Sequence, residues 1–346
     1  MLGPLLVDIA GTRLTAEDRE LLRHPLVGGV ILFARNCPDA DSVRDLAEAV
    51  HALRTPPLLI AVDQEGGRVQ RVRDGVTRLP ALALIGAQWE RDRAGARELA
   101  RDAGWLMAAE MLALGADVSF APVVDLGGRS RVIGDRAFHR DPEAVAELGV
   151  AYARGMADAG MHAVAKHFPG HGGVAEDTHV ERPVDRRELA DLELADLRPY
   201  ARLIGAGLSG VMMSHVVYPA VAPEPASLSR RWVHDILRDR YGFQGAVIAD
   251  DLSMDAASVA GLVPERVRRA LAAGCDLAPV CNDRAAVAAL LAGREAMPES
   301  AASGLRRSRL APAERPDPAD LAGDGHRRRV REALAALERD DGFHLE

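Results

Sequence analysis

Lysine is almost absent from this 346-residue sequence: Lys166 is the single lysine, and the other 42 basic residues are arginine. Arginine therefore stands wherever a general surface cation would serve. A single lysine inside an apolar run marks a position that needs a compact ammonium group rather than a planar guanidinium group. We therefore expect Lys166 to belong to a functional site.

Long apolar runs, a basic net charge and a rich set of cysteines are missing as well. No stretch approaches 18 consecutive apolar residues, so we expect no membrane span. The net charge is −8, whereas nucleic-acid-binding proteins usually carry a basic face. The three cysteines, Cys37, Cys275 and Cys281, are typical of a reduced cytoplasmic protein. The N-terminal segment has no basic residues before its short apolar run, which favours a first strand over a secretion signal.

Eight short apolar runs recur along the chain, with stretches typical of helices between them. The runs consist mostly of Val, Ile, Leu and Ala without polar alternation, as in parallel strands that are buried on both faces. The predicted strands are residues 5–10, 29–33, 58–63, 118–125, 162–168, 210–216, 246–252 and 276–280. The predicted helices are residues 39–53, 94–114, 142–159, 187–206, 230–241 and 264–273.

These repeated strand–helix units predict an α/β fold, a single-domain (β/α)8 TIM-type barrel. An open doubly wound sheet is the alternative, but no Gly-x-Gly-x-x-Gly turn follows the first run. We assign residues 1–296 to the barrel. We expect residues 297–346 to begin as a loop to about Pro318. A C-terminal helix from about Gly325 to Arg339 then follows, packed on the barrel or trailing it.

Polar side chains stand at the ends of five predicted strands. In (β/α)8 barrels the carboxyl ends of the strands meet at one rim, where the catalytic residues lie. We therefore expect these side chains to form one site. They are Asp63, Asp125, Lys166, His167, Ser214, His215, Asp250 and Asp251. His215 fits a core histidine with satisfied hydrogen bonds equally well, and we assign it no role.

The neighbouring Asp250 and Asp251 have different expected roles. Adjacent side chains of a strand point to opposite sides, so we expect only one of the two to face the barrel mouth. That carboxylate is a candidate nucleophile or charge stabiliser, and the other is a candidate structural hydrogen-bond partner.

Histidines cluster around the fifth predicted strand. A zinc site is one interpretation, since imidazole and carboxylate groups are common zinc ligands, but no His-x-x-x-His helix is present. The spacing from Asp177 to His179 indicates instead a carboxylate that orients an imidazole for proton transfer. A capping Asp and a surface His remain the alternative for that pair. We predict no metal and no cofactor. The cluster comprises His162, His167, His171 and His179.

Several longer motifs carry a family resemblance over roughly residues 1–285. Lys-His-Phe-Pro-Gly-His-Gly at 166–172, followed by Asp-Thr-His at 177–179, is highly specific. Further matches cover residues 28–36, 62–71, 133–138, 214–215 and 248–254. Together they resemble the glycoside hydrolase family 3 β-N-acetylhexosaminidases, in particular the bacterial single-domain enzymes of peptidoglycan recycling. Ala249 departs from the Ser that relatives often carry there, and the segment beyond about residue 297 matches little.

The resemblance implies a role for each matching position. Asp250 is expected to be the nucleophile, His179 the acid/base and Asp177 its dyad partner. The residues expected to bind the non-reducing N-acetylglucosamine (GlcNAc) are Asp63, Arg71, Arg136, Lys166 and His167.

The implied activity is that of a retaining exo-β-N-acetylglucosaminidase. It would cleave GlcNAc from β-1,4-linked anhydro-N-acetylmuramic acid (anhydroMurNAc) and from muropeptides in the cytoplasm, as a monomer without nucleic-acid or membrane partners. Four alternatives stay open. They are a broader family 3 exo-β-glycosidase, a phosphorylase, a metal-assisted hydrolase that uses the histidine cluster, and a non-catalytic sugar-binding barrel. A phosphorylase is included because neutral imidazole repels phosphate less than a carboxylate does.

Overall fold

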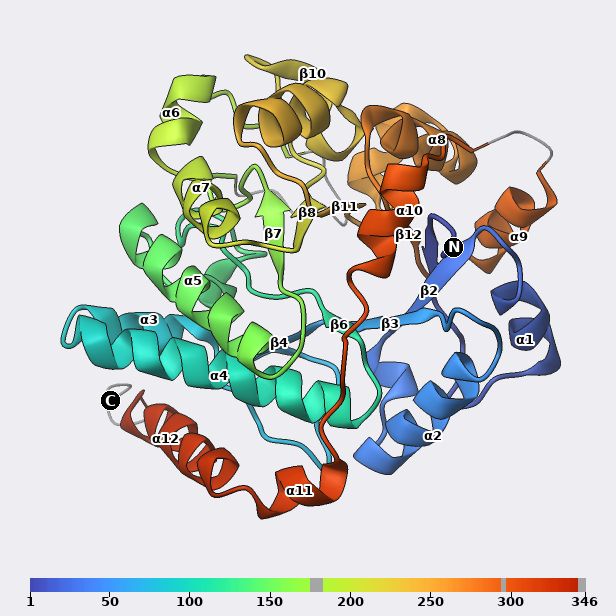
Figure 1. Cartoon of the computed structure of the whole chain (residues 1–346). Helices are drawn as coiled ribbons and strands as arrows, with labels where there is room; N and C mark the ends of the chain where they lie inside the picture. Colours follow the sequence, from blue (N-terminus) through green and yellow to red (C-terminus); the bar gives the residue numbers. More distant parts are fainter. Residues whose placement is uncertain (175–182, 294–296, 342–346) are drawn as a thin grey trace.

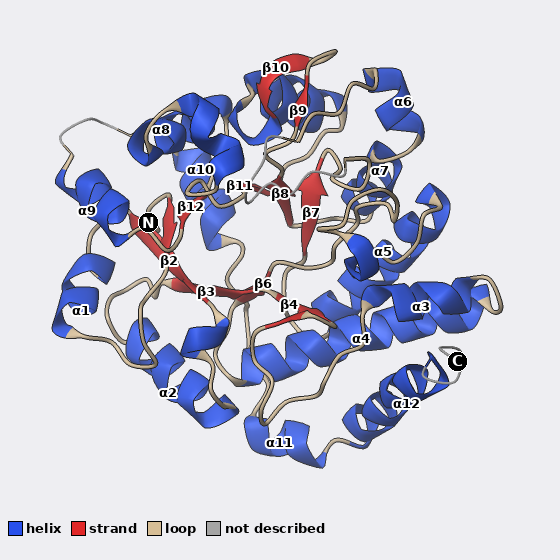
Figure 2. Cartoon of the chain, turned by 180° about the vertical axis from the view of Figure 1, so that it is seen from behind, coloured by secondary structure: helices blue, strands red, loops and turns tan. Residues whose placement is uncertain are grey.

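The fold is a ring of parallel strands surrounded by helices (Figure 1, Figure 2). It is seen in a computed structural model that describes residues 1–174, 183–293 and 297–341. The strands confirm each of the predicted runs, with shorter bounds for all except the second, which begins two residues earlier than predicted. In chain order they are β1 (Leu5–Val7), β2 (Val27–Leu32), β3 (Leu59–Val62), β6 (Val118–Ser119), β7 (Val164–Phe168), β8 (Gly210–Met213), β11 (Ala246–Ala249) and β12 (Ala278–Val280).

The strands close into a barrel. Two parallel sheets, β12-β1-β2-β3-β6 and β11-β8-β7, account for all of them. Isolated parallel bridges join the two sheets, one between Val123 and Lys166 and the other between Ile248 and Leu277. The (β/α)8 prediction is therefore confirmed, and the open doubly wound alternative is wrong.

The barrel separates two apolar clusters, which explains why its strands are apolar on both faces. Along β1, the Leu6 side chain joins the cluster inside the barrel, whereas Leu5 and Val7 join the cluster beneath the helices. Successive side chains of a strand point to opposite faces, so a strand between two cores needs apolar residues at every position.

Helices cover the outside of the barrel (Figure 2). Those up to residue 292 are α1 (Ala16–Leu22), α2 (Ala40–His51), α3 (Leu82–Trp89), α4 (Arg93–Ala113), α5 (Pro142–Asp158), α6 (Leu189–Leu194), α7 (Leu197–Gly205), η4 (Arg231–Arg240), α8 (Val263–Ala273) and α9 (Arg284–Ala292). The start of α5 follows from its sequence, since the Asp141 carboxylate accepts a hydrogen bond from Glu143 N and Pro142 occupies the first turn. Gly160 follows this helix with a positive φ of 94°, as expected of a helix terminator.

Two expectations about helices need correction. The helix predicted over 187–206 is interrupted at Ala195–Asp196, because the buried Asp196 carboxylate accepts a hydrogen bond from Arg187 instead of facing solvent. The loop predicted from Met297 to Pro318 is wrong over α10 (Ala301–Ser308), which begins at an N-cap in which Ser300 Oγ accepts from Ser303 N.

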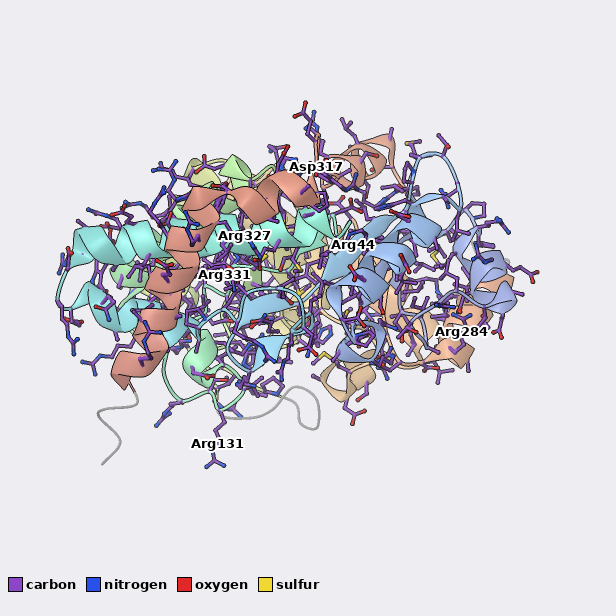
Figure 3. All side chains as sticks on the ribbon, turned by 90° about the horizontal axis from the view of Figure 1, so that it is seen from below. Arg44, Arg131, Arg284, Asp317, Arg327 and Arg331 are labelled. Carbon is purple, nitrogen blue, oxygen red and sulfur yellow. The ribbon has the colours of Figure 1, made fainter. Side chains whose placement is uncertain are left out.

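The C-terminal segment packs against the barrel and against the helix α4. After α10, the chain forms α11 (Pro318–Gly323) and α12 (Gly325–Asp341), which confirms the predicted C-terminal helix. Figure 3 shows α12 lying against α4, with Arg327 labelled between them, and Arg327 forms an ion pair with Glu110 of α4 at 2.7 Å. Among the described residues, no helix is both long and apolar enough to span a membrane.

Candidate active site

A cavity of about 720 Å³ opens at the carboxyl ends of the barrel strands. Its walls come from the ends of β2, β3, β7, β8, β11 and β12 and from the loops that follow them. One such loop contains the short hairpin of β4 (Gln64–Gly66) and β5 (Val69–Gln70). Another contains the 3-10 turn η2 (Gly134–Arg136). The cavity therefore lies where the sequence predicted a site.

A buried ion cluster forms one wall of the cavity. Lys166 Nζ lies 2.7 Å from Asp63 Oδ1 and 2.6 Å from Glu65 Oε1. Arg136 donates through Nε and Nη2 to the two oxygens of Glu65, at 2.7 and 2.8 Å. Arg71 Nη2 donates to Asp63 Oδ2 at 3.3 Å.

The pKa shifts within this cluster follow from its charges. Burial alone would raise the pKa of Glu65, but Lys166 and Arg136 more than offset burial and lower that pKa to about 2. For Asp63, Lys166 and Arg71 likewise outweigh burial, and the pKa is lowered. Burial alone would lower the pKa of Lys166, but Asp63 and Glu65 raise it. The cluster is therefore fully ionised at neutral pH, and its donors and acceptors are held in fixed positions.

A second buried network lies behind His167. The Asp125 carboxylate lies 2.7 Å from His167 Nδ1 and accepts hydrogen bonds from the backbone N–H groups of His167 and His171. His167 and His171 both line the cavity. Asp125 therefore fixes the orientation of the His167 ring and the course of the chain after β7.

Asp250 and Asp251 both line the cavity, but the Asp251 carboxylate accepts hydrogen bonds from Ser253 and Cys281, as expected of the structural hydrogen-bond partner of the pair. Their environments differ. Burial alone would raise the pKa of Asp250, but this pKa is lowered because His167, His215, the Asp251 backbone N–H and Lys166 favour the carboxylate. Burial raises the pKa of Asp251 to about 6, although Ser253 and Cys281 donate hydrogen bonds to its oxygens.

The structure brings most of the predicted site residues together. The residues that line one cavity are Asp63, Arg71, Arg136, Lys166, His167 and Asp250. Asp177 and His179 lie outside the described residues. Sequence reasoning assigned no role to Glu65, Asp125 or His171, although the first two stand at or beside strand ends and His171 belongs to the histidine cluster.

The histidine cluster is divided where the structure describes it, because His167 and His171 line the cavity with ring centroids 6.1 Å apart and His162 does not line it. His162 Nδ1 pairs with Ser209 Oγ at 3.1 Å, and neither residue lines the cavity. Within the described ranges, one group of three side chains has metal-ligand spacing: His234, Asp235 and Asp239, on η4. None of the three lines the cavity.

Comparison with known proteins gives one consistent result. The glycosyl hydrolase family 3 N-terminal domain model matches residues 4–307. A beta-hexosaminidase of Alkalilimnicola ehrlichii is 57% identical over 292 residues, 84% of each chain. A beta-hexosaminidase of Pseudomonas aeruginosa is 52% identical over 310 residues, 89% of this chain and 91% of the relative. The crystal structure of native NagZ from Neisseria gonorrhoeae superimposes with a TM-score of 0.91 at 42% identity, covering 97% of this chain and 98% of that one.

Proposed function

This chain belongs to glycosyl hydrolase family 3 and is a glycoside hydrolase of the beta-hexosaminidase type, and from this premise we propose that it removes non-reducing terminal GlcNAc from β-1,4-linked anhydroMurNAc and muropeptides. The proposed reaction is a double displacement with net retention. The observation that carries this proposal is a half-buried, ionised carboxylate, Asp250, in the cavity that also contains the Lys166 ion cluster.

Asp250 is the proposed nucleophile. Its lowered pKa keeps it ionised at neutral pH, so its lone pair is available to attack the anomeric carbon. Attack forms the glycosyl–Asp250 ester as the bond from the anomeric carbon to the leaving oxygen breaks. Asp251 is less suited to this role, because its pKa of about 6 leaves it partly protonated near neutral pH and its oxygens accept hydrogen bonds from Ser253 and Cys281.

His179 is the proposed acid/base, with Asp177 as its partner. It would give a proton to the leaving oxygen in the first step and take one from water in the second. Support for this pair comes from the Asp-x-His spacing and the family resemblance, because both residues lie outside the described part of the chain. Imidazole titrates near neutral pH and can perform both transfers.

The ion cluster is the proposed site for the sugar hydroxyl groups. Lys166 and Arg136 are donors fixed by carboxylates, and Asp63 supplies acceptors, so binding requires little reorganisation. Arg71 Nε is buried and has no partner among the described residues, so it is available to a ligand. An N-acylglucosamine subsite is also supported by the gonococcal NagZ that was crystallised with N-trifluoroacetyl-D-glucosamine and superimposes with a TM-score of 0.91.

An acidic leaving group fits the cavity mouth. Arg68 and Arg131 line the cavity and are exposed side chains, and Figure 3 shows Arg131 projecting from the body of the molecule. Arg131 has no ion-pair partner among the described residues. Cations at this position favour an aglycone that carries carboxylates, as a muropeptide does. We also propose that the protein acts as a monomer in the cytoplasm.

The test is release of chromophore from an aryl β-N-acetylglucosaminide, with the aryl β-glucoside measured alongside. The wild type is expected to cleave the acetamido sugar, and Asp250→Asn to lose at least about 1,000-fold in kcat. Asp255→Asn, an exposed aspartate on the following turn, is the matched control and keeps full activity. Equal cleavage of both sugars would indicate a broader exo-β-glycosidase. Sugar 1-phosphate formed in phosphate buffer would indicate a phosphorylase, and no cleavage of either sugar would contradict the proposal.

A further inference from the structure

One ring nitrogen of His171 has no hydrogen-bond partner among the described residues, although His171 lines the cavity. The residue is only 2% exposed and lines the cavity beside His167. Its Nε2 atom is buried and has no hydrogen-bond partner within the described residues. An unpaired buried polar atom costs stability, so a position of this kind is typical of a group that awaits a ligand.

The hydrogen-bond partner of the other ring nitrogen, Nδ1, determines whether Nε2 carries a proton. Ser130 Oγ accepts a hydrogen bond from Ile133 N at 3.3 Å and lies 3.3 Å from His171 Nδ1. Since Oγ already accepts from a backbone N–H, its own proton is free to be donated to Nδ1, and we assign this arrangement, in which Nδ1 acts as an acceptor. The neutral tautomer that remains carries its proton on Nε2. Burial lowers the pKa of His171, which keeps the ring neutral.

The neighbours of His171 indicate which part of a bound sugar it faces. Its ring packs edge-on against the ring of His167, with the two centroids 6.1 Å apart. His167 lines the same cavity as Asp250 and lowers the pKa of that carboxyl group, so His171 lies on the His167–Asp250 side of the cavity. If Asp250 attacks the anomeric carbon, the nearest substituent on that side of the ring is the group on C2.

We infer that the Nε2–H of His171 donates a hydrogen bond to the carbonyl oxygen of the 2-acetamido group and thereby selects N-acetylated sugars over 2-hydroxy sugars. This inference rests on the proposed function. The acetamido oxygen lies three bonds from C2 and a 2-hydroxyl oxygen lies one bond away, so a donor fixed for the first does not reach the second. Ser130 is a positioning residue, because it holds the required tautomer without touching the sugar. Nothing in the family resemblance assigned a role to either residue.

The test is a specificity ratio, the kcat/KM for the aryl β-N-acetylglucosaminide divided by that for the aryl β-glucoside. Because both values come from one preparation, a partly unfolded variant does not change the ratio. We expect His171→Ala to lower it about 10- to 100-fold. His171→Gln, which keeps an N–H donor, should retain more of it. Ser130→Ala should lower it by a few-fold only, because the correct tautomer stays partly populated.

The chain offers a matched control in His162, which also pairs through Nδ1 with a serine hydroxyl but lies away from the cavity. His162→Gln is expected to leave the ratio unchanged. An unchanged ratio in His171→Ala, with the wild type active on the acetamido sugar, would overturn the inference and leave the proposed function intact. A wild type inactive on both sugars would instead contradict the proposed function. Calorimetric binding of free GlcNAc and glucose to His171→Ala gives a second measurement, in which only GlcNAc should bind more weakly.

Discussion

Lys166 shows why one ammonium group persists in a chain that otherwise uses arginine. Its Nζ is enclosed by Asp63 and Glu65 at 2.7 and 2.6 Å, and the residue is 2% exposed. Arg136 already forms the bidentate pair with Glu65. A second planar guanidinium group would need more room than this buried position offers.

Lys166→Arg is therefore expected to disrupt the site although it conserves charge. Overpacking at a buried position lowers the free energy of unfolding by about 1–3 kcal/mol, and the displaced donor should raise KM for the aryl β-N-acetylglucosaminide about tenfold or more. Steady-state kinetics and chemical denaturation measure the two effects. Arg198→Lys, in an exposed ion pair with Glu143, is the control and should change neither. An unaltered KM in Lys166→Arg would refute this role for the lysine.

Asp251 predicts a specific dependence of stability on pH. Its pKa rises from 3.8 to about 6 on folding because burial disfavours the carboxylate. The folded state therefore holds this proton more tightly, and the resulting stabilisation is complete below about pH 4 and is lost as the pH rises through about 6.

Asp251→Asn removes this titration and can keep the hydrogen bonds, since an amide oxygen can accept from Ser253 N and Cys281 N as Oδ1 does now. The unfolding free energy of the wild type minus that of the variant should fall by about 1–3 kcal/mol between pH 4 and pH 7. Urea denaturation at several pH values measures it. Parallel stability curves for the two proteins would show that Asp251 does not titrate in this range.

At the scale of elements, the segments on either side of residues 175–182 pack together at Arg187. Its guanidinium group donates to Asp185 at 2.6 Å and to Asp196 at 2.7 Å, and both carboxylates are buried. Gly170 and Gly173 lie against this network so closely that a Cβ on either would come within 2.6 Å of Asp196 or Arg187. The network therefore supports the chain that carries His171.

Arg187→Met should destabilise the protein by about 2–4 kcal/mol, because it leaves the buried Asp196 carboxylate without its cation. Arg198→Met removes a guanidinium group from an exposed pair and should change stability by no more than about 0.5 kcal/mol. Thermal and chemical denaturation of both variants give the comparison. Equal small effects would mean that the Arg187 network contributes no more than a surface ion pair.

The elements that the sequence predicted well are those with a strong local signal. The barrel strands are uninterrupted apolar runs, and α5 has a capping aspartate followed by proline. The break between α6 and α7 depends on Asp196 meeting Arg187, a contact that no local pattern reports. The helix α10 has the sequence AASGLRRS, whose Gly and Ser residues have weak helix propensity. Its stability comes from tertiary contacts instead.

The site was predictable to a similar extent. Strand ends indicated Asp63, Asp125, Lys166, His167 and Asp250, because the carboxyl ends of parallel strands converge in a barrel. No role was predicted for Glu65, Asp125 or His171, because each role depends on which side chain the residue meets in the folded chain.

At the scale of the whole molecule, α10 joins the segments that precede the first and last strands of the barrel, at the barrel base. Arg307 is 1% exposed and donates to Leu2 O at 3.0 Å, to Asp276 O at 3.0 Å and to Glu299 at 2.7 Å. Leu2 and Asp276 precede β1 and β12. These contacts lie at the end of the barrel opposite the cavity.

Arg307→Gln should therefore lower the unfolding free energy by about 2–4 kcal/mol and leave kcat/KM per folded molecule unchanged. Arg309→Gln, an exposed arginine two residues later, is the control and should alter neither quantity. Denaturation curves and kinetics at a temperature where both variants are folded provide the test. A fall in kcat/KM without loss of stability would show that the base of the barrel is coupled to the cavity.

The central claim is a double displacement through Asp250, and the anomeric configuration of the first-formed product tests it most directly. Proton NMR during the first minutes of hydrolysis of an aryl β-N-acetylglucosaminide distinguishes the two anomers before mutarotation mixes them. The account predicts that the β-anomer of GlcNAc appears first and that the α-anomer grows only later, by mutarotation. Initial appearance of the α-anomer would mean direct displacement by water and would contradict a glycosyl–Asp250 intermediate.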